Sequence, residues 1–268
     1  MKRISIFMAA LFLLAACNNE NKTATVKKVK YSDLAADIYK GDIQSIEDSP
    51  YKVDSTGKIG EMDTCCFEVT DFDENGNSVK YTSKDSKGSV KNESVYTRHK
   101  SGLFMGSKDT KDGGKPAGSM TVQIDDNDMW TIAQVFDSTG KPDGYYTGIG
   151  QTEYGQVSAW KRFDKDSIFR EEGEAKFEKN LQVGFTIKDS IGKVKLTTTS
   201  KYNDKGELTE SSNTTITKDS TTTRVTKYTY DTHDEMGNWT QRTEWDDKGK
   251  AVKVVKRKYT YSNQEVKK

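Results

Sequence analysis

The chain has 268 residues, with 42 Lys and Arg against 41 Asp and Glu, and a formal net charge of +1. Because this balance leaves no basic stripe, we expect no nucleic-acid partner. Only 32% of the residues are hydrophobic, which is low for a globular protein. Leucine is scarce after position 17, whereas Thr, Tyr, Val and Phe are frequent, and this bias favours strands over helices.

Residues 1–16 have the parts of a signal peptide. Two basic residues precede an apolar run at 4–14, which is shorter than the ~20 apolar residues that a membrane-spanning helix needs. The end of the segment, Leu14 to Cys17, reads LAAC and resembles the lipobox of bacterial lipoproteins. The resemblance implies cleavage before Cys17, acylation of Cys17 and a lipid anchor in the outer membrane. An unlipidated secreted protein is the alternative.

Residues 17–40 are expected to hold the lipidated cysteine, a polar tether and one short helix. The helix is predicted over 32–41, with Ser32 as its N-cap and Gly41 as its stop. It would sit against one end of a sheet. The tether lacks the acidic run that directs some Bacteroidetes lipoproteins to the cell surface. We therefore favour the periplasmic face of the outer membrane, with surface display as the alternative.

Residues 41–268 are predicted to form a domain of β-hairpins, with a possible weak division near 150. Seven Asp/Asn-x-x-Gly turns recur, in which the first side chain accepts a backbone N–H and the glycine takes a positive φ. The segments between them alternate with period 2, as half-buried strands do. We predict an all-β fold, an antiparallel meander of successive hairpins that forms an open, extended sheet. The turns begin at Asp54, Asp73, Asp85, Asp137, Asp189, Asn203 and Asp246.

The aromatic residues of the last hairpin are spaced as strand residues. A turn at 246–249 would place Trp245 opposite Ala251 and Trp239 opposite Arg257, so a cation–π pair is expected there. Trp239, Trp245 and Tyr259 would then share one face of the sheet. We favour a packed face, and the alternative is that these aromatics face a ligand.

One motif in this region resembles a known repeat. Tyr230-Asp231, followed by Gly237-Asn238 and Arg242, resembles the YD (RHS-type) repeat, and Phe72-Asp73 with Gly76-Asn77 is a weaker copy. The resemblance implies a sheet of successive hairpins, as in Bacteroidetes lipoproteins that carry such repeats. It does not imply an enzyme.

No constellation of catalytic, metal-binding or cofactor-binding residues stands out. The only histidines, His99 and His233, lie in polar surroundings, and no Gly-x-Ser-x-Gly, Walker or dinucleotide motif is present. Cys65 and Cys66 are adjacent, so in a strand one would be buried and one exposed, and no Cys/His spacing suggests zinc. We expect no metal, no cofactor and no catalytic residue.

Three functions remain open. The leading hypothesis is a non-enzymatic, lipid-anchored envelope protein that presents a β-sheet scaffold or binding surface. Its partners would be the membrane, through the anchor, and an unidentified envelope protein or glycan. The alternatives are a carbohydrate-binding or glycan-processing accessory lipoprotein, with Trp130, Trp160, Trp239 or Trp245 stacking on sugars, and an immunity or antitoxin-like partner.

Five Asp-Ser-x triplets resemble the acceptor of Bacteroidetes O-glycosylation. The same triplets are ordinary turn chemistry, and both interpretations require an exposed loop tip. The possible acceptors are Ser55, Ser138, Ser167, Ser190 and Ser220.

Overall fold

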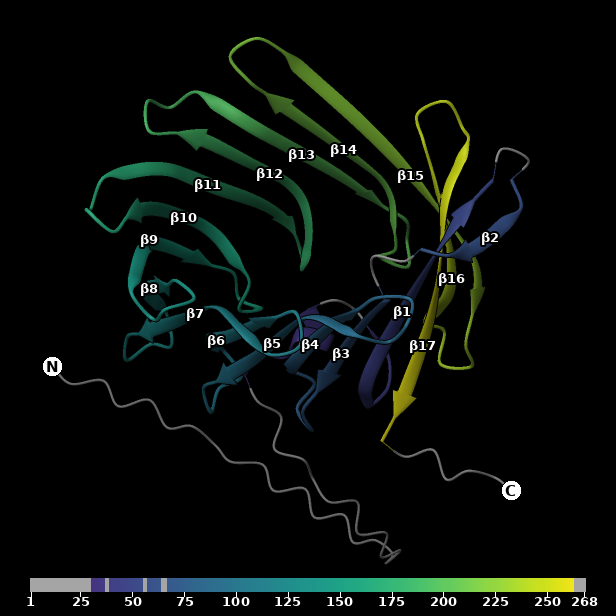
Figure 1. Ribbon diagram of the computed structural model, residues 1–268, viewed down its shortest axis with the longest axis horizontal. Helices are drawn as coiled ribbons and strands as arrows, with labels where there is room; N and C mark the ends of the chain where they lie inside the picture. Colours follow the sequence, from purple (N-terminus) through teal and green to yellow (C-terminus); the bar gives the residue numbers. More distant parts are fainter. Residues whose placement is uncertain (1–29, 37–38, 55–56, 64–66, 263–268) are drawn as a thin grey trace, which may run out of the picture.

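The computed structural model describes residues 30–36, 39–54, 57–63 and 67–262 (Figure 1). The predictions about the signal peptide, the tether, Cys17, Ser55, Cys65 and Cys66 lie outside these residues. Within them, no helix is long and apolar enough to cross a membrane.

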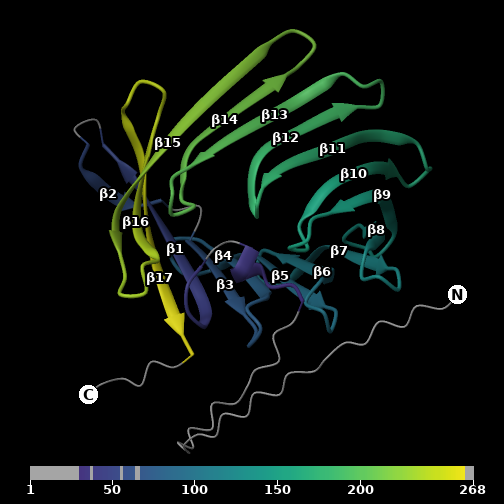
Figure 2. The ribbon, with the colours of Figure 1, turned by 180° about the vertical axis from the view of Figure 1, so that it is seen from behind.

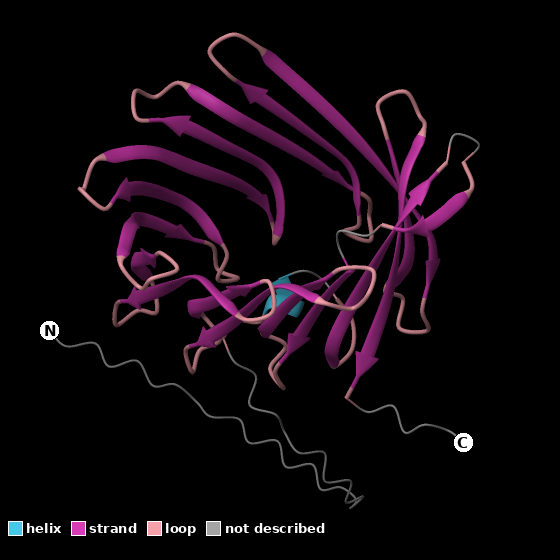
Figure 3. Ribbon diagram, viewed as in Figure 1, coloured by secondary structure: helices cyan, strands magenta, loops and turns pink. Residues whose placement is uncertain are grey.

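The described chain contains one four-residue helix and seventeen strands, which Figure 3 separates by colour. The helix is α1 (Asp33–Ala36). The strands are β1 (Ile43–Val53), β2 (Ile59–Met62), β3 (Phe67–Phe72), β4 (Ser78–Lys84), β5 (Val90–Arg98), β6 (Phe104–Lys111), β7 (Lys115–Ile124), β8 (Trp130–Phe136), β9 (Pro142–Gln151), β10 (Val157–Asp164), β11 (Phe169–Glu178), β12 (Leu181–Asp189), β13 (Val194–Tyr202), β14 (Leu208–Ile216), β15 (Thr221–His233), β16 (Trp239–Trp245) and β17 (Ala251–Tyr261).

The strands close into a barrel. From β3 to β17 each strand pairs antiparallel with the next, and β1 pairs with both β17 and β3. Ile46, for example, lies opposite Tyr259 on one side and Thr70 on the other. The barrel therefore has sixteen strands, β1 and β3–β17, and β2 is a short addition at the end of β1. The ring of strands can be followed from both sides in Figures 1 and 2.

The prediction of an open sheet with a short helix at its end is wrong. Closure pairs the unsatisfied backbone groups of the two edge strands, which an open sheet leaves exposed. The helix expected over 32–41 is a single turn, Asp33–Ala36. It lies within the ring of strands in Figure 3, where it contacts turns and inner side chains.

The predicted turn chemistry is confirmed wherever the structure describes it. At 137–140, the Gly140 N–H donates to the Asp137 carbonyl, and Asp137 Oδ1 accepts the N–H groups of Thr139 and Lys141. Gly140 has φ +80°, the left-handed conformation that such a turn requires. Because consecutive strands are antiparallel, these turns alternate between the two ends of the barrel.

The outward face of the strands is charged. Arg98 of β5 binds Asp33 inside the barrel, so strand alternation turns Val95 and Glu93 outward. Val95 is 47% exposed, and Glu93 forms an ion pair with Lys80 across the strands at 2.8 Å. The same arrangement recurs around the barrel. The further outward pairs are Lys188–Glu172, Lys201–Glu210 and Lys258–Glu47.

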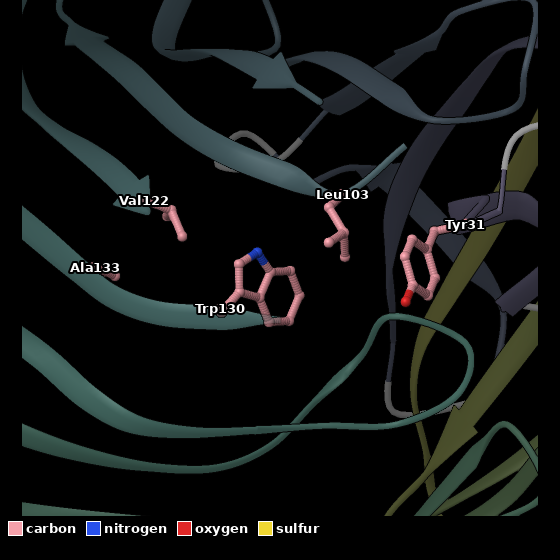
Figure 4. Close-up of a cluster of buried hydrophobic side chains, with 5 residues drawn as sticks. All are labelled: Tyr31, Leu103, Val122, Trp130 and Ala133. Atoms are coloured by element: carbon pink, nitrogen blue, oxygen red, sulfur yellow. The ribbon is translucent and has the colours of Figure 1, made fainter. Parts of the chain in front are cut away.

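Most of the buried apolar residues gather at one end of the barrel, and Val254 and Val255 of β17 are buried as well. Two clusters form there, and each contains residues of the segment that precedes β1. The first contains Tyr31, Leu103, Val122, Trp130 and Ala133. In Figure 4, Trp130 lies between Val122 and Leu103, with Tyr31 beyond Leu103. The second contains Leu34, Ile43 and Ile46. The core is thus a lining around the N-terminal segment rather than a layer between two sheets.

Candidate functional site: a plugged lumen with two chambers

The segment formed by residues 30–36 and 39–40, which we call the plug, closes one end of the barrel. Its backbone binds turns from separate hairpins. Tyr31 N–H donates to the Ser101 carbonyl, and Leu34 N–H donates to the Gly76 carbonyl. At the other end of the plug, the side-chain amide of Asn238 accepts from Lys40 N–H and donates to the Lys40 carbonyl, at 3.0 and 2.7 Å.

The turn glycines distinguish the plugged end from the open end. A Cβ on Gly102 would meet the Tyr31 carbonyl oxygen at 2.1 Å, and one on Gly155 would meet the Tyr31 ring at 2.7 Å. At the open end a Cβ on Gly88, Gly140 or Gly192 would meet nothing within 4 Å. The plug therefore fills the space between the turns of one end only.

Two arginines tie the plug to the inner wall. Arg98 binds Asp33 at 2.5 Å and also donates to the Ser78 carbonyl and hydroxyl. Arg257 donates to both Asp48 carboxylate oxygens at 2.6 and 2.5 Å and to the Tyr39 hydroxyl at 2.5 Å. Burial lowers the pKa of Arg257, but the bonds to Asp48 outweigh it and raise the pKa above its ordinary value.

Arg257 also makes the contact with Trp239 that the sequence predicts, although the strand register differs from the predicted one. Its guanidinium lies 4.0 Å from the centroid of the Trp239 ring, so the predicted cation–π pair is present. The predicted register is confirmed at Trp245, which pairs with Ala251. An irregularity follows, and Gln241 pairs with Lys256, one residue away from the register that would place Trp239 opposite Arg257.

The expectation that Trp239 and Trp245 share a face is wrong. Between them β15 and β16 lose register, because Thr232 pairs with Gln241 and His233 pairs with Trp239. The extra residue reverses the alternation. Trp239 points inward, is 9% exposed and contacts Arg257, whereas Trp245 lies on the outer face and donates to the Thr229 hydroxyl.

Beside the plug lies an apolar cavity of about 580 Å³, the aromatic chamber. Its walls come from strands β6–β10 and its floor from the plug. The residues around it are Tyr31, Asp33, Arg98, Gly102, Leu103, Phe104, Met120, Val122, Trp130, Ala133, Tyr146, Ile149, Tyr154, Gly155, Gln156, Val157 and Trp160. Gly173 makes room for one of these rings, because a Cβ there would lie 2.4 Å from Trp160.

A second cavity of about 590 Å³, the polar chamber, lies beside the other end of the plug, where Tyr39 and Lys40 line it. It combines aromatic rings with amide and charged side chains, and it meets the aromatic chamber at Gln156 and Val157. Its lining residues are Tyr39, Lys40, Gln156, Val157, Phe177, Asn180, Leu181, Gln182, Tyr202, Lys205, Gly206, Glu207, Leu208, Tyr230, Gly237, Asn238 and Trp239.

Three tyrosines in and near the polar chamber make the same type of hydrogen bond between neighbouring strands. The hydroxyls of Tyr202, Tyr230 and Tyr259 donate to the carbonyls of Gln182, Leu208 and Trp239, each on the preceding strand. Burial raises the pKa of Tyr230 and Tyr259, so both hydroxyls stay protonated donors. These hydrogen bonds hold neighbouring strands together near the plugged end. The Tyr259 side chain, one of the predicted ligand-facing aromatics, is half-buried.

The YD-like motif acquires a physical role from this geometry. Tyr230 faces the lumen and fastens β15 to β14, while Asp231 faces outward and accepts from Gln241 and Thr243 of β16. The Asn238 amide of the same motif holds the plug. Its counterpart in the weaker copy, Asn77, is 1% exposed, and its amide has no hydrogen-bond partner among the described residues.

The histidines do not form a relay. His99 Nδ1 lies 2.8 Å from Ser101 Oγ and 3.5 Å from Asp128 Oδ1, so the hydroxyl and the carboxylate approach the same ring nitrogen. A hydrolytic triad needs them on opposite nitrogens. His233 Nε2 lies 2.5 Å from Glu207, beside the polar chamber. Among the described residues, no group of three or more His, Cys, Asp or Glu side chains is placed to hold a metal.

The possible glycan acceptors that the structure describes all lie at the open end. Ser138, Ser167, Ser190 and Ser220 are exposed and occupy the turns that follow β8, β10, β12 and β14. None of them contributes to either chamber.

The sequence singles out Trp130, Trp160 and Trp239, but it does not predict that the segment before β1 lies beside these residues inside a barrel. The residue just after each turn glycine does distinguish the plugged end from the open end. At the open end this residue is exposed and is often lysine, as at Lys141, Lys193 and Lys250. At the plugged end it is Asn77, Leu103, Gln156, Glu207 or Asn238, and none of these is exposed.

Fold and site together define an all-β, sixteen-stranded barrel with a plugged lumen. No family model matches the chain, and no curated protein matches it. Among solved structures, it is similar to a porin-like protein from Bacteroides uniformis, with 12% identity and a TM-score of 0.52, over 82% of this chain and 99% of that one. This likeness shows the barrel fold.

Two further matches are weaker. A porin-like protein from Bacteroides vulgatus has 11% identity and a TM-score of 0.34, over 82% of this chain and 99% of that one. The TcdB2-TccC3-TEV structure has 14% identity and a TM-score of 0.32 over 78% of this chain, which spans only 11% of that longer chain.

Proposed function

We propose that this protein is a lipid-anchored envelope protein whose barrel lies in water and binds a small ligand in its plugged lumen, without catalysis. The observation that carries the proposal is the pair of chambers between plug and wall, of about 580 and 590 Å³. Cavities of this size, lined by aromatic rings and a few polar groups, are typical of small-molecule sites.

The charged outer wall argues against a pore in a bilayer. A barrel embedded in lipid presents an apolar band flanked by aromatic girdles, and a Lys or Arg at the bilayer midplane costs about 2–4 kcal/mol there. This barrel presents ion pairs such as Lys80–Glu93 and Lys201–Glu210 to its surroundings. The charged outer wall therefore favours a barrel in water over a pore in a bilayer.

The anchor would come from Cys17, ahead of the plug. Residues 17–30 span at most about 45 Å when extended, so lipidation would keep the plugged end towards the membrane. The open end, with its possible glycan acceptors, would face away. We favour the periplasmic face of the outer membrane.

The anchor is tested by fractionation of Cys17→Ala. We expect this variant to lose its acyl chains and to remain an unprocessed or mislocalised precursor, because the residue that is acylated and cleaved at is absent. A Cys17→Ala protein that is still acylated and membrane-anchored contradicts the proposal.

Ligand binding is tested by native mass spectrometry of the full chain purified from host membranes. We expect a small-molecule adduct on the wild-type protein and on Gln134→Phe, a control on the exposed outer face. The double variant Ala133→Phe/Leu181→Trp, which fills both chambers, should lose it. A wild-type mass equal to the lipidated polypeptide, or to that polypeptide with glycans only, contradicts lumenal binding.

A carbohydrate ligand is the second candidate. The polar chamber favours it, because Trp239 and Tyr230 lie beside Glu207, Gln182 and Asn238. Sugars are bound by such mixtures of rings and hydrogen-bonding side chains. Identification of the adduct as a glycan that is lost in Leu181→Trp and kept in Ala133→Phe would establish this alternative.

A further inference from the structure

The two chambers differ in the chemistry that they offer. The aromatic chamber exposes mainly carbon, and its lining contains only two charged side chains, Asp33 and Arg98. The polar chamber exposes carbon and polar atoms about equally and is lined by Lys40, Lys205 and Glu207. A ligand of one chamber is therefore unsuited to the other.

The two charges of the aromatic chamber are already neutralised. Asp33 and Arg98 form an ion pair at 2.5 Å, and the remaining guanidinium bonds go to Ser78 and to the Gly102 carbonyl. The Arg98 side chain is 13% exposed. An anionic group on a ligand would have to break this pair to find a counter-ion, and burial of an uncompensated charge is costly.

Two hydrogen-bonding groups of the chamber lining are also engaged, those of Trp130 and Gln156. Trp130 Nε1 donates to the Phe104 carbonyl at 2.8 Å, so the indole offers its carbon face. Gln156 Nε2 donates to the Asn180 carbonyl at 3.0 Å. Tyr146 and Trp160 meet edge to face, with ring centroids 5.4 Å apart, and form a rigid apolar corner.

We propose that the aromatic chamber is a binding site for a neutral, largely apolar small molecule, held by ring contacts with Trp130, Tyr146 and Trp160. This assignment rests on the proposed function and names the ligand class of one of its two chambers. The driving force is burial of apolar surface, at about 25 cal/mol per Å². Selection against anions comes from the closed Asp33–Arg98 pair.

The test uses two fluorescent probes that share a skeleton, N-phenyl-1-naphthylamine and its anionic analogue 8-anilino-1-naphthalenesulfonate. Each is titrated into the full chain, with quenching of tryptophan emission by energy transfer as a second readout. We expect the neutral probe to bind about tenfold or more tightly than the anionic one, because the sulfonate finds no free counter-ion. Equal or tighter binding of the anionic probe overturns the proposal.

The location is tested by a matched pair of substitutions on β8. Ala133 is 6% exposed and faces the chamber, whereas the next residue, Gln134, is exposed on the outer face. Ala133→Phe should weaken the neutral probe by about tenfold or more, and Gln134→Phe should leave it unchanged. Circular dichroism of both variants confirms the fold. Equal affinity in Ala133→Phe and wild type overturns the assignment.

This inference and the proposed function fail separately. A native adduct that is lost in Leu181→Trp but retained in Ala133→Phe, together with no preference for the neutral probe, would remove the apolar site and leave lumenal binding standing. An absence of native adduct with selective binding of the neutral probe in the chamber would leave the site and remove the function.

Discussion

At the scale of single residues, the two Gly-Asn pairs of the YD-like copies have different energetic consequences. Asn238 replaces missing strand partners for Lys40 and also donates to the Tyr261 hydroxyl. Asn77 is equally buried, but its amide has no partner among the described residues. The same sequence motif thus contains one satisfied and one unsatisfied buried amide.

We predict opposite outcomes for replacing the two asparagines by leucine. Asn238→Leu leaves the Lys40 backbone groups unpaired and should cost about 1–3 kcal/mol, with faster tryptic cleavage after Lys40. Asn77→Leu removes an unsatisfied amide, so the free energy of unfolding should be unchanged or higher. Urea denaturation measures both. A large loss of stability in Asn77→Leu would show that its amide has a partner.

At the scale of elements, the hairpin turns are similar in chemistry and different in surroundings. Gly102 and Gly140 both adopt positive φ, at +93° and +80°. The space beside Gly140 is open, whereas the Tyr31 carbonyl lies beside Gly102. The turn motif therefore specifies a hairpin, and the plug decides which hairpins also carry a packing constraint.

We predict that Gly102→Ala destabilises the protein at least twice as much as Gly140→Ala. Both variants place an L side chain in the left-handed region, which costs about 1–2 kcal/mol. Gly102→Ala must in addition displace the Tyr31 backbone, which ends the Tyr31–Ser101 hydrogen bond. Urea denaturation of the two variants measures the difference. Equal losses of stability would mean that the Tyr31 backbone can move away from position 102 at no cost in free energy.

The first aspartates of the turns make stability depend on pH. Backbone N–H donors lower the pKa of Asp85, Asp125 and Asp164, and the Thr139 hydroxyl together with backbone donors lowers that of Asp137, all below the ordinary 3.8. The folded state then binds fewer protons than the unfolded state below about pH 4, so stability rises with pH. The stabilisation from these aspartates is fully present when the pH is above their ordinary pKa, and it is lost as the pH falls through their lowered pKa values.

We predict that the urea midpoint falls steadily between about pH 5 and pH 2.5. Asp137→Asn keeps an acceptor oxygen but cannot be protonated, so its midpoint should fall less over this range. Ser138→Ala, in the same turn, is the control and should follow the wild-type curve. A midpoint that is constant down to pH 2.5 would show that the turn carboxylates do not stabilise the fold.

At the scale of the whole molecule, the closed barrel of sixteen strands has ion pairs on its outer wall, and the plug lies across one end of its lumen. Such a wall is costly to place in lipid, where a Lys or Arg at the bilayer midplane costs about 2–4 kcal/mol.

We predict that the purified protein produces no conductance steps in a planar lipid bilayer. The variant Asn238→Leu, which loses one of the hydrogen-bonded anchors of the plug, should also be silent, because the charged outer wall opposes insertion whatever the state of the plug. Single-channel recording with a known porin as positive control makes the measurement. Steps in both proteins would mean that the outer wall enters lipid, whereas steps in the variant alone would mean that the plug is the gate of a pore.

The sequence by itself determined the local structure of this protein. Asp137 to Gly140 and its equivalents specify hairpins because each turn satisfies its own backbone within five residues, and period-2 segments specify strands for the same local reason. The sequence also predicts the Trp239–Arg257 contact, because one hairpin brings these residues together. It does not predict closure of the barrel, because Ile46 pairs with Tyr259 across more than two hundred residues, and open and closed sheets share the same alternation.

The candidate site belongs to the tertiary structure. Trp130 and Trp160 have strand spacing whether they pack, face solvent or line a cavity, and only the ring of strands turns them inward. The extra residue in β16 that separates Trp239 from Trp245 leaves no mark in the spacing of the tryptophans. The sequence of the plug predicts a short helix but not its place in the lumen, which is set by the turns that bind Tyr31, Leu34 and Lys40. The lumen forms only when strands far apart in the sequence pair with each other. The free energy that stabilises it comes from contacts that no short window of sequence contains.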